Sequence, residues 1–231
     1  MLKNKNVKIW NDRYNSNQNI AKYPFDQIIS LVMQRFKDKK ERESSNILDY
    51  GCGGGNNFWF LAREGFEAYA CDVASSAIEM TKRRMEDEKI ILPEDRYRLL
   101  EGEILPFPDQ FFNAIIDRES LCQSTWSEIQ SRIREFRRIL KPGGWYLGIN
   151  FTCHHPDIRH ADALGDGDWY KFKEGSFKDQ GTRHFFSINE IKHIFADWHI
   201  ESVAELRINS ILGIQDETSE YIIAAQVKRG I

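Results

Sequence analysis

The sequence predicts an α/β fold, in which short buried strands alternate with amphipathic helices. Three features lead to this prediction. Residues 47–50 read Ile-Leu-Asp-Tyr and run into a glycine cluster, after which residues 58–64 show helical spacing. A strand, a glycine turn and a helix in this order open a nucleotide-binding α/β unit. Further apolar strands follow, and the helices between them begin with capping boxes at residues 76–79, 125–128 and 187–190.

Length and charge limit the classes of protein to consider. With 231 residues the chain suits one compact domain with a substantial core. Its 32 basic and 35 acidic residues give a formal charge of −3, which argues against a large nucleic-acid surface. The start of the chain is polar, no segment is apolar enough to span a membrane, and the four cysteines form no Cys-x-x-Cys pair. We therefore expect one cytoplasmic domain over residues 1–231, with no nucleic-acid or membrane contact.

Residues 1–45 are expected to form a helical and aromatic segment that docks on the rest of the chain. The segment is polar at its start but carries interleaved aromatic residues, among them Trp10 and Tyr14. Pro24 favours the first turn of a helix, and apolar residues at helical spacing continue from there to about Lys40.

The glycine turn has the pattern Asp49-x-Gly51-x-Gly53-x-Gly55. Glycine is needed there because a side chain would block the approach of the backbone to a ligand. A dinucleotide-binding turn has a third small residue, which in this sequence falls on Asn56. An acid beside the turn suits a cationic ligand and would repel a pyrophosphate. The turn therefore argues against a dinucleotide ligand.

A second short strand, residues 66–72, ends in Asp72, which lies 21 residues beyond Gly51. At about this distance an acid binds the ribose hydroxyls of a nucleotide, since its two oxygens can accept hydrogen bonds from a cis-diol. The alternative is that Asp72 caps the next helix, which we expect to begin at the Ser76–Glu79 capping box. The glycine turn and the acid occur together at the expected distance, which favours the ribose role.

Downstream of Asp72 the chain continues to alternate between strands and helices. Strands are expected at residues 97–100, 113–117, 145–151, 200–208 and 221–227. The helix before the third of these ends at Lys141-Pro142-Gly143-Gly144. Residues 152–186 interrupt the pattern, because they are rich in His, Asp, Gly, Lys and aromatic residues and have no clear period. A connection of this length inside a compact domain is usually a functional insertion.

Three ordered motifs resemble those of class I S-adenosylmethionine (SAM)-dependent methyltransferases. They are the glycine turn, the run Glu-Ile-Leu-Pro-Phe-Pro-Asp at residues 103–109, and Leu-Lys-Pro-Gly-Gly at residues 140–144 before an apolar strand. The resemblance covers the chain from residue 47 to its end. It implies a Rossmann-like, doubly wound sheet of seven mostly parallel strands flanked by helices, with the last strand antiparallel. It also implies transfer of a methyl group from SAM, which leaves S-adenosylhomocysteine, to an O or N atom of a small molecule by in-line displacement.

The same resemblance implies a set of cofactor-binding residues. Glu103 holds the place of the acid that accepts from the adenine amino group, where the family more often has Asp, and Ile104 holds the place whose backbone amide meets the ring. The segment Trp10–Tyr14 matches an N-terminal aromatic segment that folds over the cofactor, although simple packing of an N-terminal helix is an equal alternative. The full set is Tyr14, Asp49, Gly51, Cys52, Gly53, Asp72, Val73, Glu103, Ile104 and Asp117.

The acceptor is less well defined by the sequence. Residues 117–120 read Asp-Arg-Glu-Ser and lack the Pro-Pro motif of enzymes that methylate base or glutamine amino groups, and no Pro-Cys nucleophile follows. A small-molecule acceptor therefore remains, with residues 152–186 shaping its pocket. We hypothesise that His154 or His155, directly after the fifth strand, acts as a general base. His184 and Glu119 are further candidates, and no metal site is expected because zinc-ligand spacing is absent.

Two other functions stay open at this point. The chain could be an NAD-dependent oxidoreductase with the same fold, against which Asn56 and the downstream motifs argue. It could also bind SAM without turnover, because an intact glycine turn and Asp72 predict binding and not chemistry. The oligomeric state is not indicated by the sequence.

Overall fold

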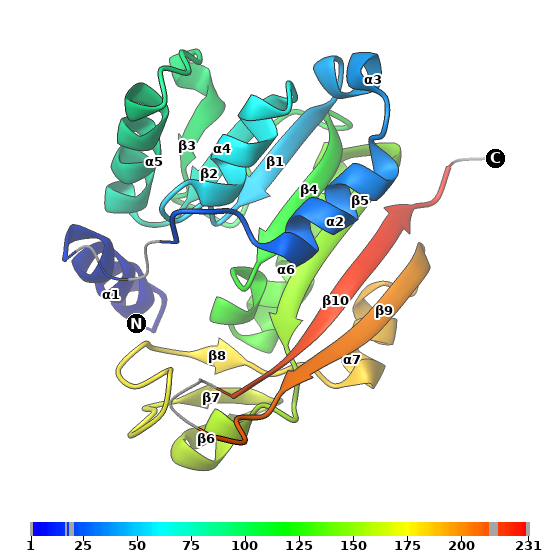
Figure 1. Cartoon of the computed structure of the whole chain (residues 1–231). Coiled ribbons are helices and arrows are strands. Elements are labelled where there is room, and N and C mark those ends of the chain that lie inside the picture. The colour runs from blue at the N-terminus through cyan, green and yellow to red at the C-terminus, as the bar shows by residue number, and fades with distance from the viewer. Residues whose placement is uncertain (1, 17, 19–20, 213–216, 230–231) are drawn as a thin grey trace.

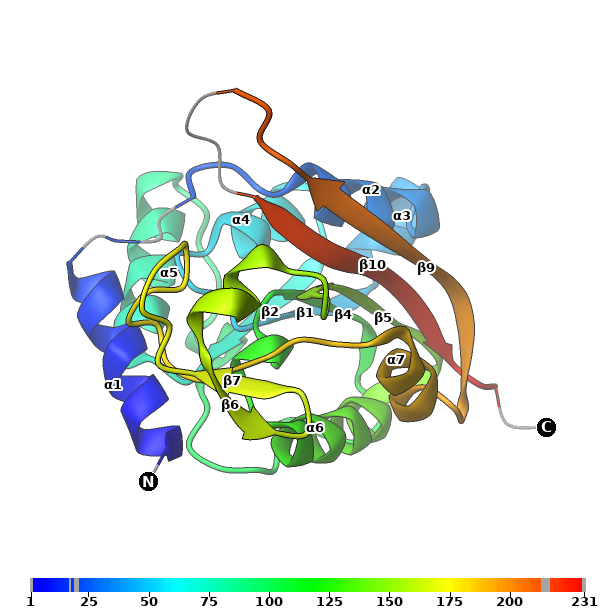
Figure 2. The same cartoon turned by 90° about the horizontal axis from the view of Figure 1, so that it is seen from below.

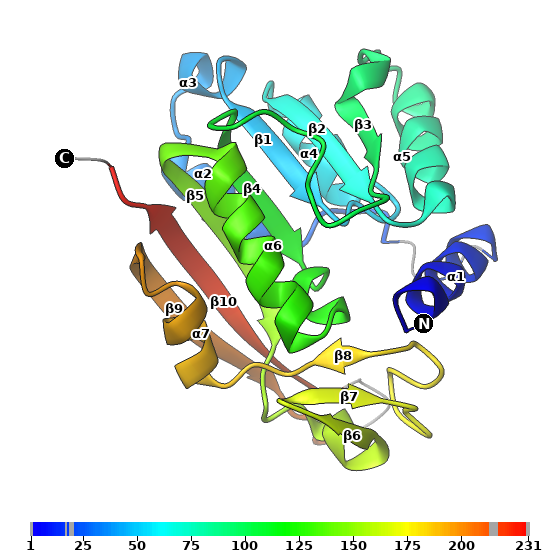
Figure 3. The same cartoon turned by 180° about the vertical axis from the view of Figure 1, so that it is seen from behind.

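The computed structural model describes residues 2–16, 18, 21–212 and 217–229. A seven-stranded sheet forms its centre, with α2 (Asp26–Arg35) and α4 (Asn56–Arg63) on one face and α6 (Trp126–Ile139) and α7 (Ile188–Ile194) on the other (Figures 1 and 3). No helix within the described ranges is long and apolar enough to cross a membrane.

The strand order of the central sheet is β3-β2-β1-β4-β5-β10-β9. Strands β3, β2, β1, β4 and β5 are parallel to one another, and β10 runs antiparallel to both of its neighbours. The fold predicted from the sequence is thus confirmed, including the antiparallel last strand. The strands are β1 (Asn46–Tyr50), β2 (Glu67–Asp72), β3 (Tyr97–Leu99), β4 (Phe112–Arg118), β5 (Leu140–Phe151), β9 (Trp198–Ile208) and β10 (Thr218–Val227).

The order of the strands places a topological switch point between β1 and β4. The chain moves from β1 outward to β2 and β3, and then returns to the other side of β1 with β4. In open α/β sheets the crevice beyond the carboxyl ends of such strands is the usual ligand site.

The inner strands are buried on both faces, which explains their apolar composition. Consecutive residues of β1 face opposite cores: Ile47 packs with Phe58 of α4, whereas Leu48 packs in the cluster that contains Phe136 of α6. On β4, Ile115 and Ile116 divide between the two cores in the same way. The carboxyl ends of β1 and β4 are therefore held from both sides.

The remaining helices lie before β1 and in the connections between the strands. They are α1 (Leu2–Asn15), α3 (Lys39–Glu43) and α5 (Ser75–Asp87), with 3-10 helices η1 (Glu94–Arg96), η2 (Leu121–Gln123) and η3 (Pro156–His160). The capping boxes that begin at Thr125 and Ser187 form as predicted.

Two helix predictions were wrong in their boundaries. The helix expected from Pro24 to about Lys40 ends at Arg35, and α3 starts separately because the Asp38 carboxylate accepts from the backbone amides of Lys40 and Glu41. The capping box expected at Ser76 does not form. Helix α5 is instead preceded by Ala74, and the Ser76 hydroxyl contacts Asn11 of α1.

The segment expected to be an insertion forms a small antiparallel sheet beyond the carboxyl end of the main sheet (Figures 2 and 3). Its strands are β6 (Asp162–Gly165), β7 (Asp168–Tyr170) and β8 (Arg183–His184). The Asp168 carboxylate joins this sheet to the start of α6, because it accepts from the Trp126 amide at 3.0 Å and lies 2.7 Å from Nδ1 of His184.

Candidate active site

A cavity of about 980 Å³ lies beyond the carboxyl ends of β1, β2 and β4. This volume is at the upper end of the range of small-molecule sites, roughly 300–1,000 Å³. The main sheet contributes Tyr50 to Gly54, Asp72, Val73, Leu100 and Glu103 to its wall, and the turn after β4 contributes Arg118, Glu119 and Ser120. Helix α1 and residues 176–182 of the insertion close the other sides.

The glycine turn brings bare backbone to the cavity. Gly51 and Gly53 have φ angles of +70° and +51°, which favour glycine. A Cβ atom at Gly51 would lie 2.0 Å from Oγ of Ser120, and one at Gly53 would lie 2.6 Å from the Tyr14 hydroxyl oxygen. The turn is therefore packed closely on two sides, and only glycine fits at either position. Cys52 is also part of the cavity wall.

Asp72 presents a carboxylate to the cavity from the end of β2. Its Oδ2 accepts from the Gly53 amide at 3.0 Å, and its Oδ1 accepts from the Ala74 amide at 2.9 Å. Each oxygen keeps a further lone pair for a ligand hydroxyl. Burial raises the pKa of Asp72, although the amide hydrogen bonds oppose the shift. Asp72 therefore binds the start of the next helix, as the alternative role requires, and it also lines the cavity, where its binding of ribose stays a prediction.

Asp49 lies beneath the glycine turn with only 1% of its surface exposed, and it does not line the cavity. Burial raises its pKa to about 8, an effect that an amide hydrogen bond from Phe58 opposes. Its Oδ2 has no hydrogen-bond partner among the described residues. The ionised form is therefore poorly stabilised, and a nearby positive charge would favour it.

Helix α1 covers the cavity between α5 and the insertion (Figure 2). The Tyr14 hydroxyl lies against Gly53, and the Tyr14 ring stacks on Trp10 with 5.8 Å between centroids. Burial raises the pKa of Tyr14 well above its usual value, so its hydroxyl stays protonated. At the other end of the helix, Asn6 donates to the Gln123 carbonyl at 3.1 Å and accepts from the Thr182 amide at 3.2 Å.

Comparisons with known proteins agree with this geometry. Residues 47–144 match the family model described as a methyltransferase domain. The ubiquinone/menaquinone biosynthesis C-methyltransferase UbiE of Neisseria gonorrhoeae is 30% identical over 136 residues, which are 57% of this chain and 51% of that protein. These matches support a relationship to class I SAM-dependent methyltransferases. It spans about half the length of the curated relatives that it matches.

Solved structures extend the likeness over nearly the whole fold. A SAM-dependent methyltransferase from Methanosarcina mazei superimposes with a TM-score of 0.69 at 17% identity, covering 90% of this chain and all of the other. The [4+2]-cyclase SpnF gives a TM-score of 0.66 at 16% identity, covering 99% and 96%. At such identities these structures show that the methyltransferase fold is shared, and no more than that.

The cofactor-binding residues expected in this methyltransferase family divide into two groups. Those that line the cavity are Tyr14, Gly51, Cys52, Gly53, Asp72, Val73 and Glu103. Asp49 and Asp117 lie beneath its wall, and the side chain of Ile104 is 75% exposed and does not line it. The backbone near Glu103 is held by Arg132, whose Nη1 donates to the Glu103 carbonyl at 3.0 Å.

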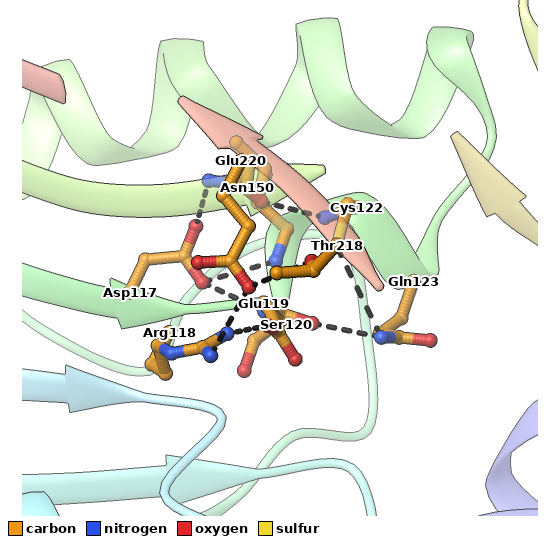
Figure 4. Close-up of polar contacts among 10 residues, drawn as sticks. Asp117, Arg118, Glu119, Ser120, Cys122, Gln123, Asn150, Thr218 and Glu220 are labelled. Atoms are coloured by element: carbon orange, nitrogen blue, oxygen red, sulfur yellow. Dashed lines mark hydrogen bonds and ion pairs between the residues drawn. The ribbon is translucent and has the colours of Figure 1, made fainter. Parts of the chain in front are cut away.

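Asp117 does not present its carboxylate to the cavity. Oδ1 accepts from the backbone amides of Ser120 and Leu121 at 2.9 and 3.1 Å, and Oδ2 accepts from the Tyr146 hydroxyl at 2.7 Å and from the side-chain amide of Asn150 at 2.9 Å. Figure 4 shows Asp117 with Ser120 and Asn150. These four donors occupy its oxygens, so it holds the turn after β4 in place. Its expected contact with the cofactor has no support in this geometry.

The two histidines proposed as general bases lie away from the cavity, which corrects their expected placement. His154 is half exposed, with Nδ1 2.8 Å from Oε1 of Glu205 on β9. His155 is buried against Phe151 and Phe177, and burial lowers its pKa to about 4. The chain leaves β5 toward β9 and the aromatic interior of the insertion, and not toward the cavity. A catalytic role for either histidine stays a prediction without geometric support.

Sequence reasoning named Glu119 as a candidate base but missed Arg118 and Ser120, its neighbours in the turn that follows β4 at the switch point. Arg118 forms ion pairs with Glu119 and with Glu220, the latter at 3.3 Å (Figure 4). Its guanidinium also lies 4.2 Å from the ring centre of Phe25. Glu119 has a φ of +58°, which is unusual outside glycine, and Ser120 donates to the Gly51 carbonyl at 3.2 Å. Their position directly after β4 was the available signal, because ligands bind where the strand order reverses.

Proposed function

We propose that this protein is a methyltransferase that uses SAM to methylate a small-molecule acceptor. The observation that supports this best is the shared cavity. One end is formed by the glycine turn and Asp72, and the other by the turn after β4 and the insertion. Two ligands can therefore meet in one cavity, which group transfer between them requires.

The residues at the first end fit the cofactor. Gly51 and Gly53 line the cavity with backbone, and the Asp72 carboxylate has free lone pairs for ribose hydroxyls. The unpaired Oδ2 of Asp49 favours a ligand with an ammonium group nearby. When bound, SAM supplies an electrophilic methyl group on a sulfonium ion. Tyr14 of α1 covers this end, where its hydroxyl lies against Gly53.

The residues at the second end hold and orient the acceptor. Correct orientation alone can contribute on the order of 7–11 kcal/mol to a two-reactant step. An acceptor oxygen or nitrogen, or a carbon as the name of the UbiE relatives suggests, needs a base only where it keeps its proton at the reaction pH. Glu119 is the carboxylate of the β4 turn that lines this end, and we assign proton removal to it where a base is needed.

Calorimetric titration with SAM, S-adenosylhomocysteine and NAD tests the proposed cofactor. We expect micromolar binding of both adenosyl ligands and no binding of NAD. Replacing Asp72 with Asn removes the charged acceptor and should weaken adenosyl binding at least tenfold. Asp87→Asn serves as the matched control, because Asp87 is an exposed residue at the end of α5.

The outcomes separate the functions that the sequence left open. Binding of NAD without SAM would favour the oxidoreductase. Adenosyl binding without methyl transfer to any member of a broad acceptor panel would favour a SAM-binding protein without turnover. Equal affinities in Asp72→Asn and Asp87→Asn would contradict the assignment of the ribose site to Asp72.

A further inference from the structure

Arg183 on β8 is a buried cation without a full set of hydrogen-bond partners. Its relative exposure is 1%, which makes it the largest fully buried side chain in the described part of the chain. Nη2 donates to Oε1 of Gln180, whereas Nε and Nη1 have no acceptor within the described ranges. Because a guanidinium carries five N–H donors, three of them, one on Nε and two on Nη1, remain unused there.

The surroundings of Arg183 compensate its charge only in part. The guanidinium lies 4.2 Å from the ring centre of Phe177 and 6.0 Å from that of Trp10. Burial lowers its pKa to about 10, and the positive charge of Arg13 adds to this effect. The Asp157 carboxylate opposes the shift, but it accepts from the Phe177 amide and forms no ion pair with Arg183. The side chain therefore stays charged at neutral pH.

A buried charge in this state is costly, because it has lost its hydration without gaining a counter-ion. A buried polar group that lacks a partner usually has a functional reason or an additional ligand. Arg183 forms no ion pair with another described charge. An anion from outside the chain would therefore explain why a charged side chain occupies this buried position.

Arg183 does not itself line the cavity, but its neighbours at the acceptor end do. Gln180, which holds it, lines the cavity, and so do Trp10 and the adjacent Thr182. Helix α1 indicates the distance between the two ends of the cavity. Tyr14 contacts Gly53 at the cofactor end, and Trp10 faces Arg183. The two residues are four positions apart, which is about 6 Å along the helix. A small acceptor beside the cofactor can span that distance.

We propose that Arg183 and Gln180 form an anion-binding subsite at the acceptor end of the cavity, and that the methyl acceptor carries a carboxylate. This inference rests on the proposed methyltransferase function. A monoanion matches the single uncompensated guanidinium, and a planar carboxylate can accept from two of its N–H groups at once. A dianionic phosphate suits the subsite less well, because the negative charge of Asp157, which acts on Arg183, would repel two ligand charges more strongly than the single charge of a carboxylate.

Thermal unfolding in the presence of saturating S-adenosylhomocysteine tests the subsite. The probes are benzoate and phenylacetate, each compared with its neutral amide, and sulfate at equal ionic strength is the control for general anion effects. The variants are Arg183→Met, which removes the charge, and Arg183→Lys, which keeps it. Arg159→Met is the matched control, because Arg159 is an exposed arginine of the same insertion.

We expect at least one acid to raise the Tm of the wild-type protein and to bind at least tenfold more tightly than its amide. Arg183→Met should lose this response and keep S-adenosylhomocysteine binding, Arg183→Lys should keep part of it, and Arg159→Met should match wild type. Without probe, Arg183→Met should be at least as stable as wild type, because an uncompensated charge is gone.

Equal effects of acid and amide, or no effect of either acid, would overturn the proposal. So would an equal effect of sulfate, or an acid response that persists in Arg183→Met. If S-adenosylhomocysteine does not bind, the proposed function fails, and the same probes decide the subsite in the protein alone. The wild-type comparison of acid with amide needs no variant, so a folding failure of Arg183→Met leaves the test intact.

Discussion

The two ends of the cavity are built in different ways. At the cofactor end, Gly51 and Gly53 offer backbone, and the Asp72 carboxylate is held by two backbone amides. At the acceptor end, the insertion offers side chains, among them Gln180 and the incompletely paired Arg183. A wall made of backbone cannot change without changing the fold. A wall made of side chains can change by substitution, so that end is suited to set the specificity for the acceptor.

The largest expected effect comes from a methyl group added to the backbone wall. In Gly51→Ala, the new Cβ would lie 2.0 Å from Oγ of Ser120 on a residue with φ of +70°. Strain and overpacking together should cost roughly 2–5 kcal/mol of unfolding free energy and abolish adenosyl binding. Gly102→Ala is the control, because a Cβ there meets nothing within 4 Å. Urea unfolding and calorimetry measure both effects, and a stable Gly51→Ala protein that binds would refute the close packing of this turn.

The next effect concerns the buried acid beneath that wall. The pKa of Asp49 is raised from 3.8 to about 8, so its carboxyl is protonated in both states below pH 3.8 and only in the folded state between these values. Stability is therefore lost as the pH rises from about 4 to 8. At ~1.4 kcal/mol per pKa unit, the loss is on the order of 5 kcal/mol.

Asp49→Asn should remove this pH dependence. The variant should match wild type near pH 4 and exceed it in unfolding free energy by several kcal/mol at pH 8, while binding adenosyl ligands more weakly. Urea unfolding at a series of pH values checks the first expectation, and calorimetry checks the second. If the stability difference between the two proteins did not vary with pH, Asp49 would be ionised in the folded protein at all these values.

A smaller effect is expected where helix α1, which forms a lid over the cavity, meets the main fold. Oδ1 of Asn11 on α1 accepts from the Ser76 amide at 3.1 Å and contacts the Ser76 hydroxyl at 2.9 Å. Asn11→Ala should loosen α1 and weaken S-adenosylhomocysteine binding about three- to tenfold, with less than about 1 kcal/mol lost in stability. Lys8→Ala, an exposed change on the same helix, should leave both unchanged. Equal affinity in the two variants would mean that α1 is not a lid.

The smallest effect is expected at a residue that belongs to neither wall. His154 is half exposed and paired with Glu205 on the far side of β5 from the cavity wall. His154→Ala should keep adenosyl binding and stay within about 0.5 kcal/mol of wild-type stability. Turnover with an acceptor, once one is found, should also be unchanged. A loss of turnover with binding intact would restore the general-base hypothesis for this residue.

The cofactor end could be predicted from the sequence because its determinants are local. Gly51, Gly53 and Asp72 occur at fixed spacing around two strands. This spacing predicts a ligand-binding turn because backbone geometry alone requires it. The parallel strands could also be predicted from local sequence, because both of their faces are apolar. Helix ends were less predictable: the Ser76 hydroxyl fits a capping box, yet in the structure it contacts Asn11, a residue 65 positions away.

The acceptor end could not be predicted because its determinants depend on distant contacts. Arg183 stands in a polar segment without period, and only the packing of β8 against α1 and the insertion buries it. His154 and His155 show the opposite error. Their position at the end of β5 predicted a catalytic site, but the structure places them away from the cavity. The direction in which the chain leaves that strand depends on Glu205 and Phe177, which are far away in the sequence.

A crystal structure of the protein with S-adenosylhomocysteine would test the central claim most directly. The two-ended cavity predicts that the ligand lies along Gly51 to Gly53 with its ribose hydroxyls on Asp72, and that the space toward Gln180 stays open for an acceptor. A ligand bound elsewhere, or one that fills the end at Gln180 and leaves Asp72 without contact, would contradict the division of the cavity into cofactor and acceptor ends.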